Sequence, residues 1–92
     1  MKSVAWDDEA IADLNAIADF ISKDSKRAAA KVVTYIRDRA LLLETSPELG
    51  RVTPDGRFRE LVLSRFPYIL LHTISDDEVR IVAVFHHSQK RR

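Results

Sequence analysis

The chain has 92 residues, of which 46% are hydrophobic and 32% charged, and it contains no cysteine. This length predicts one domain over residues 1–92, and the composition excludes a disordered chain, which needs few apolar residues and a large net charge. The absence of cysteine excludes disulfides, thiolate metal sites and a cysteine nucleophile. No apolar stretch approaches the roughly 20 residues of a membrane-spanning helix, so we expect a cytoplasmic protein.

The net charge of +1 is unevenly distributed. Residues 1–50 carry seven Lys or Arg and nine Asp or Glu, a balance of −2, whereas residues 51–92 carry eight and five, a balance of +3. The chain ends in Lys90-Arg91-Arg92. A basic second half indicates an anionic or acidic partner, or simply a solvated surface.

The first half of the chain has the apolar spacing of two helices. Apolar residues recur every three or four positions, first at Ala10, Leu14, Ile17 and Ile21, and then at Ala29, Val32, Val33, Ile36, Ala40 and Leu43. Asp7 or Asp8 can cap the first helix and Ser25 the second. The second helix should end near Ser46, because the residue before a proline disfavours helical geometry. Since the connection at 23–25 is short, the helices should form an antiparallel pair.

The second half has the spacing of strands. After a segment rich in glycine and proline at 47–56, the apolar period becomes two, which predicts strands at 58–63, 68–74 and 79–86. The run at 68–74 is almost continuously apolar and indicates a central strand. Residues 2–6 predict a further short strand. The fold class is therefore α+β: a short N-terminal strand, an antiparallel helical pair and a three-stranded antiparallel meander, with the helices on one face.

Isolated histidines and aromatic residues are assigned mainly to structure. His72 lies inside the central apolar strand, and a histidine in such a strand is more often a core residue than a ligand. The three histidines have no metal-binding spacing, so neither a metal nor another cofactor is expected. Trp6 and Phe20 are candidates either for anchors of a partner or for the core, and core packing is the commoner place of large aromatic side chains.

Several segments along the chain match a known pattern in their order and spacing. These are Trp6, Ala10, Asp13-Leu14, Ile17, Ala28-Ala29-Ala30, Ile36, Leu43, Pro47, Gly50-Arg51, Arg59-Glu60-Leu61-Val62, Pro67-Tyr68-Ile69 and His86. Together they resemble the RelE/ParE superfamily of type II toxins, small bacterial proteins held inactive by a co-expressed antitoxin. The resemblance covers almost the whole chain and implies a cognate antitoxin, encoded nearby, in a toxin–antitoxin hetero-oligomer.

The superfamily divides by target. Arg-Glu-Leu-Val at 59–62 followed by Pro-Tyr-Ile at 67–69 is similar to the ParE branch, whose members inhibit DNA gyrase without known nuclease chemistry. Members of the RelE branch cut mRNA on the ribosome and usually carry an arginine where this chain has Ile69. They also carry a C-terminal aromatic residue, whereas nothing aromatic follows Phe85 here. The resemblance favours a gyrase inhibitor without catalysis. The alternatives are a RelE-like endoribonuclease and an inactive member retained for regulation.

Candidate site residues follow from these alternatives. A gyrase inhibitor needs no catalytic residue, whereas a nuclease would need a base, an acid and a cation for the phosphorane charge, and the available set is His87, Glu60 and Arg65. Contact with an anionic target is assigned to basic residues of the second half: Arg59, Arg65, His86, His87, Lys90 and Arg91.

The antitoxin is expected to bind beside the helices. An antiparallel helical pair next to a sheet leaves a groove that a partner helix can fill, and the resemblance implies such a wrapping segment. The residues assigned to this contact are Leu14, Ile17, Ile21 and Ile36.

Overall fold

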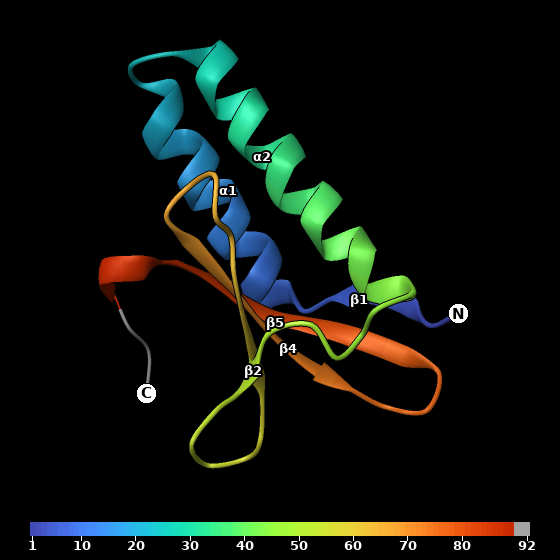
Figure 1. Ribbon diagram of the computed structural model, residues 1–92. Helices are drawn as coiled ribbons and strands as arrows, with labels where there is room; N and C mark the ends of the chain where they lie inside the picture. Colours follow the sequence, from blue (N-terminus) through green and yellow to red (C-terminus); the bar gives the residue numbers. More distant parts are fainter. Residues whose placement is uncertain (90–92) are drawn as a thin grey trace.

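The computed structural model describes residues 1–89, and it contains two helices and one sheet (Figure 1). The elements in chain order are β1 (Ser3–Trp6), α1 (Asp8–Ser22), α2 (Lys26–Leu41), the 3₁₀ turn η1 (Leu42–Glu44), β2 (Arg51–Val52), β3 (Arg59–Val62), β4 (Tyr68–Ile74), β5 (Glu78–His86) and the 3₁₀ turn η2 (His87–Gln89). The α+β class, both helices and the antiparallel β3-β4-β5 meander are confirmed. No helix in this part of the chain is long and apolar enough to cross a membrane.

The sheet has the strand order β1-β5-β4-β3-β2, so β4 is central, as its apolar run predicts. β1 pairs with β5 in parallel, with Ser3 opposite Glu78 and Trp6 opposite Ile81. Parallel neighbouring strands need a long connection. The two helices and the strands between β1 and β5 provide it. β2 is an additional strand that pairs antiparallel with β3. The sequence does not predict it, because two residues are too few to show an alternation.

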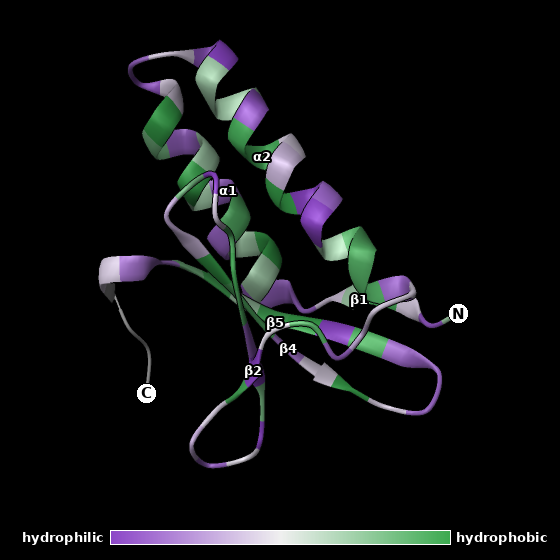
Figure 2. Cartoon of the chain, in the orientation of Figure 1, coloured by the Kyte–Doolittle hydropathy of each residue, from purple (hydrophilic) through white to green (hydrophobic). Residues whose placement is uncertain are grey.

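The helices pack on one face of the sheet and form the main core there (Figure 1). Its buried members are Ala10, Val32, Ile36, Ala40, Leu43, Leu61, Leu63, Leu70, Val79, Ile81 and Val84. A smaller cluster of Ile69, Ala83 and Phe85, with Leu71 against it, is separate from this core. Figure 2 shows the hydrophobic residues of the helices alternating with hydrophilic ones, as expected for helices with one buried side. Because Leu70 belongs to one cluster and Ile69 to the other, β4 is buried on both faces.

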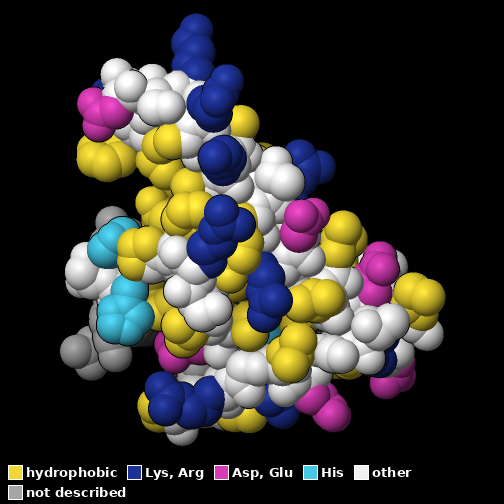
Figure 3. All heavy atoms as spheres, turned by 45° about the horizontal axis from the view of Figure 1, so that its top comes forward, with side chains coloured by type: hydrophobic (Ala, Val, Ile, Leu, Met, Phe, Trp, Pro, Cys, Tyr) yellow, Lys and Arg dark blue, Asp and Glu magenta, His cyan; other side chains and the backbone are white. Residues whose placement is uncertain are grey.

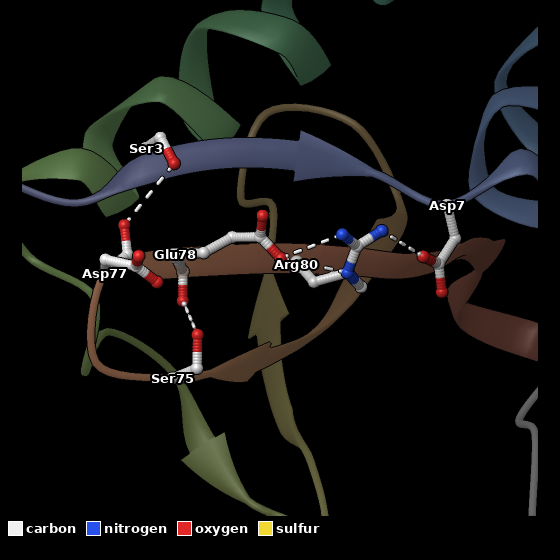
Figure 4. A network of polar contacts seen from close by, with 6 residues as sticks. All are labelled: Ser3, Asp7, Ser75, Asp77, Glu78 and Arg80. Carbon is white, nitrogen blue, oxygen red and sulfur yellow. Dashed lines mark hydrogen bonds and ion pairs between the residues drawn. The ribbon is translucent and has the colours of Figure 1, made fainter.

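Of the two predicted helix caps, the structure contains the one at Ser25 but not the one at Asp7. The Ser25 side chain accepts a hydrogen bond from the Ala28 backbone N–H at 3.0 Å, as predicted. Asp7 occupies the N-cap position of α1 but makes no side-chain cap. Its carboxylate instead accepts a hydrogen bond from Arg80 at 2.7 Å, and Arg80 also pairs with Glu78 at 2.9 Å (Figure 4). Asp7 therefore joins the start of α1 to β5.

The second helix ends earlier than the sequence predicts. α2 stops at Leu41 rather than near Ser46, and the chain tightens into η1 before Pro47. A 3₁₀ turn at a helix C-terminus satisfies some of the last carbonyl groups, and here the Thr45 N–H donates to the Leu42 carbonyl at 3.3 Å.

Gly50 permits the close approach of the chain to β3. Its φ is +90°, and a β-carbon at this position would lie 2.4 Å from the Glu60 carbonyl oxygen. Gly56 has a similar φ of +75°, yet a β-carbon there would meet no neighbouring atom within 4 Å. The two glycines share a left-handed conformation and differ in the space around them.

We expect Gly50→Ala to destabilise the protein more than Gly56→Ala. The left-handed conformation costs an alanine about 1–2 kcal/mol at either position. At Gly50 the backbone must also move away from Glu60, so the loss of unfolding free energy should be at least twice as large. Urea unfolding of both variants measures the difference, and equal losses would contradict the contact with Glu60.

Candidate functional site

A groove of about 640 Å³ lies between α1 and the end of β5. It is lined by Asp13, Ala16, Ile17 and Phe20 of α1, and by Tyr68, Val84, Phe85, His86 and Ser88. β1 pairs with β5 only as far as Ile81, and beyond that point α1 lies beside the edge of β5. The groove therefore exists because β1 is shorter than the strand that it pairs with.

Asp13 attaches α1 to this strand edge. Its Oδ2 atom accepts a hydrogen bond from the Val84 backbone N–H at 3.0 Å. The carboxylate takes the place of a neighbouring strand, because an edge N–H otherwise needs another chain or water. The sequence places Asp13 in the family pattern without this role, since the contact joins residues far apart in the chain.

His86 forms the other wall of the groove. Its ring meets the Tyr68 ring edge to face, with 5.5 Å between the ring centres. Its Nδ1 atom accepts the Ser88 backbone N–H at 3.1 Å and lies 2.8 Å from the Ser88 hydroxyl oxygen. Accepting at Nδ1 places the proton of the neutral ring on Nε2. Burial raises the pKa of Tyr68 above its ordinary value, so its phenol stays neutral.

The groove brings together one residue from each predicted set, Ile17 for the antitoxin and His86 for the target. Leu14 and Ile21 are half-buried and pack against the main core. Ile36 is fully buried, with 0% of its surface exposed, because it sits at the centre of the core between α2 and the sheet. The expectation that Ile36 contacts a partner is therefore not retained.

Phe20 corrects another expectation. Its aromatic side chain predicts a place in the core, but 72% of its surface is exposed. It lies near the end of α1, and it lines the groove beside Ile17. Trp6, by contrast, packs against the main core as predicted.

The basic residues assigned to the target lie at separate places. Arg59 donates from Nη1 to the carbonyl oxygens of Glu48 at 2.9 Å and Gly50 at 3.4 Å, so it braces the segment before β2. His87 is exposed in η2, and its backbone N–H donates to the Pro67 carbonyl at 2.7 Å. Lys90 and Arg91 lie outside the described residues.

Of the three residues of the nuclease alternative, Glu60 lies apart, whereas His87 contacts Pro67 in the turn that carries Arg65. Glu60 lines a second cavity of about 480 Å³, whose floor includes Leu71 and Phe85 of the smaller apolar cluster. Arg65 lies beside α2, where its backbone N–H donates to the Tyr35 hydroxyl at 3.2 Å. The sheet thus separates Glu60 from the side on which Arg65 contacts the helices.

His72 is a core residue, as predicted, with 0% of its surface exposed. Its Nε2 lies 3.1 Å from the Pro47 carbonyl oxygen, and its buried Nδ1 has no hydrogen-bond partner among residues 1–89. Burial lowers the pKa of His72, the nearby Arg59 charge lowers it further, and the Pro47 carbonyl opposes both effects. Within residues 1–89, no three acidic or histidine side chains lie close enough together to hold a metal ion.

Comparisons with known proteins agree on one family. A family model described as the ParE toxin of the type II toxin–antitoxin system parDE matches residues 4–91. Protein Y4kP of Sinorhizobium fredii, described as a toxin, is 38% identical over 97% of this chain and 92% of its own length. Toxin RelE2 of Caulobacter vibrioides is 36% identical over 94% of this chain and 96% of its own length. A solved structure of the chromosomal ParDE system from P. aeruginosa is 27% identical, covers 94% and 96% of the two chains, and superposes with a TM-score of 0.82.

The fold and these matches define a toxin of the RelE/ParE superfamily, as the sequence resemblance predicts. The chain belongs to the ParE toxin family of type II toxin–antitoxin systems. Such a toxin implies a cognate antitoxin as its partner.

We expect acid to destabilise the protein through His72. The unfolded chain takes up a proton at His72 as the pH falls below 6.5, whereas the lowered pKa keeps the folded form neutral to a lower pH. Unfolding is therefore favoured as the pH falls through this range, by at most about 1.4 kcal/mol per pH unit.

Urea unfolding of the native chain and of His72→Gln, between about pH 7 and pH 5, tests this expectation. The carboxylates titrate in both proteins, so the difference between the two stability curves reports His72. Parallel curves would mean that His72 protonates equally well in the folded chain.

Proposed function

We propose that this toxin inhibits DNA gyrase by binding and has no catalytic activity of its own. The observation that carries the proposal is the separation of Glu60 from Arg65, two of the groups that RNA cleavage would need. Glu60 lines a cavity whose floor is the smaller apolar cluster, while Arg65 contacts the α2 side. General acid–base catalysis requires its groups within hydrogen-bond reach of the same reacting atoms.

The position after Tyr68 supports the same proposal. Ile69 is 4% exposed and belongs to the smaller apolar cluster. The nuclease branch usually has an arginine there, and an apolar buried residue supplies no charge to a phosphorane. The likeness to the ParDE structure from P. aeruginosa, at 27% identity, also supports the ParE branch.

A second candidate function is ribosome-dependent mRNA cleavage. It is favoured by the 36% identity to a relative named Toxin RelE2 and by the exposed position of His87 in η2. Cleavage would require a partner acid and a cation at the same site as His87.

We expect the purified chain to inhibit DNA supercoiling by gyrase and to leave ribosome-bound mRNA intact. A bound inhibitor that blocks the gyrase cycle should also cause cleaved DNA to accumulate. Supercoiling, DNA cleavage and mRNA integrity are measured with the same preparation over one range of toxin concentration. Site-specific mRNA cuts with normal supercoiling would favour the nuclease, and inactivity in all three assays would favour a regulatory member.

We also propose that the antitoxin occupies the groove between α1 and β5. Its apolar wall contains Ile17 and the exposed ring of Phe20, and an exposed phenylalanine beside a groove is a suitable anchor for a partner helix. Covering the Phe20 ring would remove apolar surface from water, which stabilises a complex by about 1.5–3 kcal/mol.

We expect Phe20→Ala to weaken antitoxin binding by about 1.5–3 kcal/mol, which is roughly 10-fold to 150-fold in Kd. Leu41→Ala is the matched control, because Leu41 is also an exposed apolar helix residue, at 52%, but lies at the end of α2. Calorimetric titration of each variant with the protein encoded beside the toxin measures the effect. Equal antitoxin affinities for the two variants would show that Phe20 is not part of the interface.

A further inference from the structure

A row of cations follows one side of α2. Arg27, Lys31, Tyr35 and Arg39 are spaced by four residues, which places successive side chains about 6 Å apart along the helix and on one slowly turning face. We call these four residues together with Arg65 the α2 stripe. Figure 3 shows Lys and Arg side chains in a column that descends along this part of the molecule.

Arg65 joins the stripe through Tyr35. The Arg65 backbone N–H donates to the Tyr35 hydroxyl at 3.2 Å, and its guanidinium lies 5.4 Å from the centre of the Phe66 ring. Phe66 in turn meets the Tyr35 ring edge to face at 5.3 Å. These contacts hold the β3–β4 turn against α2, so the cations come from two elements that pack as one surface.

No stripe residue takes part in an ion pair within residues 1–89. The ion pairs found there are those of Arg80 with Asp7 and Glu78. The Arg39 Nε atom is buried and has no hydrogen-bond partner in this part of the chain. Burial acts to raise the pKa of Tyr35, but hydrogen bonds with Arg65 and Ser64, together with the charges of Arg39 and Arg65, lower it below its ordinary value.

We propose that the α2 stripe binds the phosphate backbone of duplex DNA. A row of Lys and Arg along one helix is the electrostatic pattern of a nucleic-acid-binding surface, and guanidinium groups bind phosphate oxygens in pairs. A protein partner would need apolar anchors at the centre of the contact. The aromatic residue of the stripe, Tyr35, is half-buried with its ring against Phe66. The exposed large apolar residue of α2 is Leu41, which lies about 160° around the helix from Arg39 at the same end of the stripe.

This inference rests on the proposed function, because gyrase acts on duplex DNA and would bring that DNA to the toxin. The toxin would then contact both components of the gyrase–DNA complex. The stripe contains four cations, so full engagement predicts a slope of about −3.6 when the logarithm of the binding constant is plotted against the logarithm of salt concentration.

The test is fluorescence anisotropy of a labelled DNA duplex with the purified full-length chain, without gyrase, over a range of salt. Arg27→Gln combined with Lys31→Gln removes two exposed stripe charges and should reduce the salt slope by about 1.8. Lys26→Gln combined with Arg37→Gln is the matched control. It removes the same charge from two exposed positions of the same helix, about 80° or more around it from Arg27 and Lys31. The control should keep most of the native slope.

A third variant, Arg27→Lys with Lys31→Arg, keeps the charge and should bind as the native chain does. Circular dichroism of all variants establishes that they fold. Equal slopes for the stripe variant and its control would overturn the inference, as would loss of antitoxin affinity with unchanged DNA binding, which would assign the stripe to the antitoxin. Because gyrase is absent, failure to bind DNA is distinguished from failure to inhibit supercoiling, which is measured separately.

Discussion

The parallel pairing of β1 with β5 ends at Ile81, well before β5 ends at His86. This unequal length leaves part of the β5 edge without a strand neighbour. Asp13 of α1 accepts the Val84 N–H at that edge, so a helix occupies the position that a longer β1 would have taken. The groove, its Tyr68–His86 wall and the exposed end of α1 all depend on this substitution of a helix for a strand.

The groove also suits a small toxin that is controlled by binding. A domain of this size buries a modest fraction of its surface and has a small margin of stability, so a partner that binds the folded form adds to it by mass action. Phe20, at 72% exposed, is apolar surface that residues 1–89 leave largely uncovered. Under the proposed function, neutralisation and stabilisation of the toxin would therefore be effects of the same contact.

The two helices carry charges of opposite sign. α1 contains Asp8, Glu9, Asp13 and Asp19 and no basic residue, whereas α2 contains Lys26, Arg27, Lys31, Arg37 and Arg39 and one acidic residue. The groove lies along α1 and the stripe along α2, so the proposed antitoxin and DNA surfaces are on different helices. This separation makes the two proposals independently testable, because variants distant from each other have additive effects.

The sequence alone determined the elements that depend on local spacing. The period of 3.6 predicted α1 and α2, the period of two predicted β3, β4 and β5, and Ser25 was predicted as a cap because capping is local. Tertiary structure decided the rest. β2 is too short for a pattern, and the fates of Phe20, Ile36 and Asp13 depend on where α1 and α2 meet the sheet. Periodicity shows which side of an element is apolar, but exposure at its ends and contacts between distant residues are set by how the elements pack.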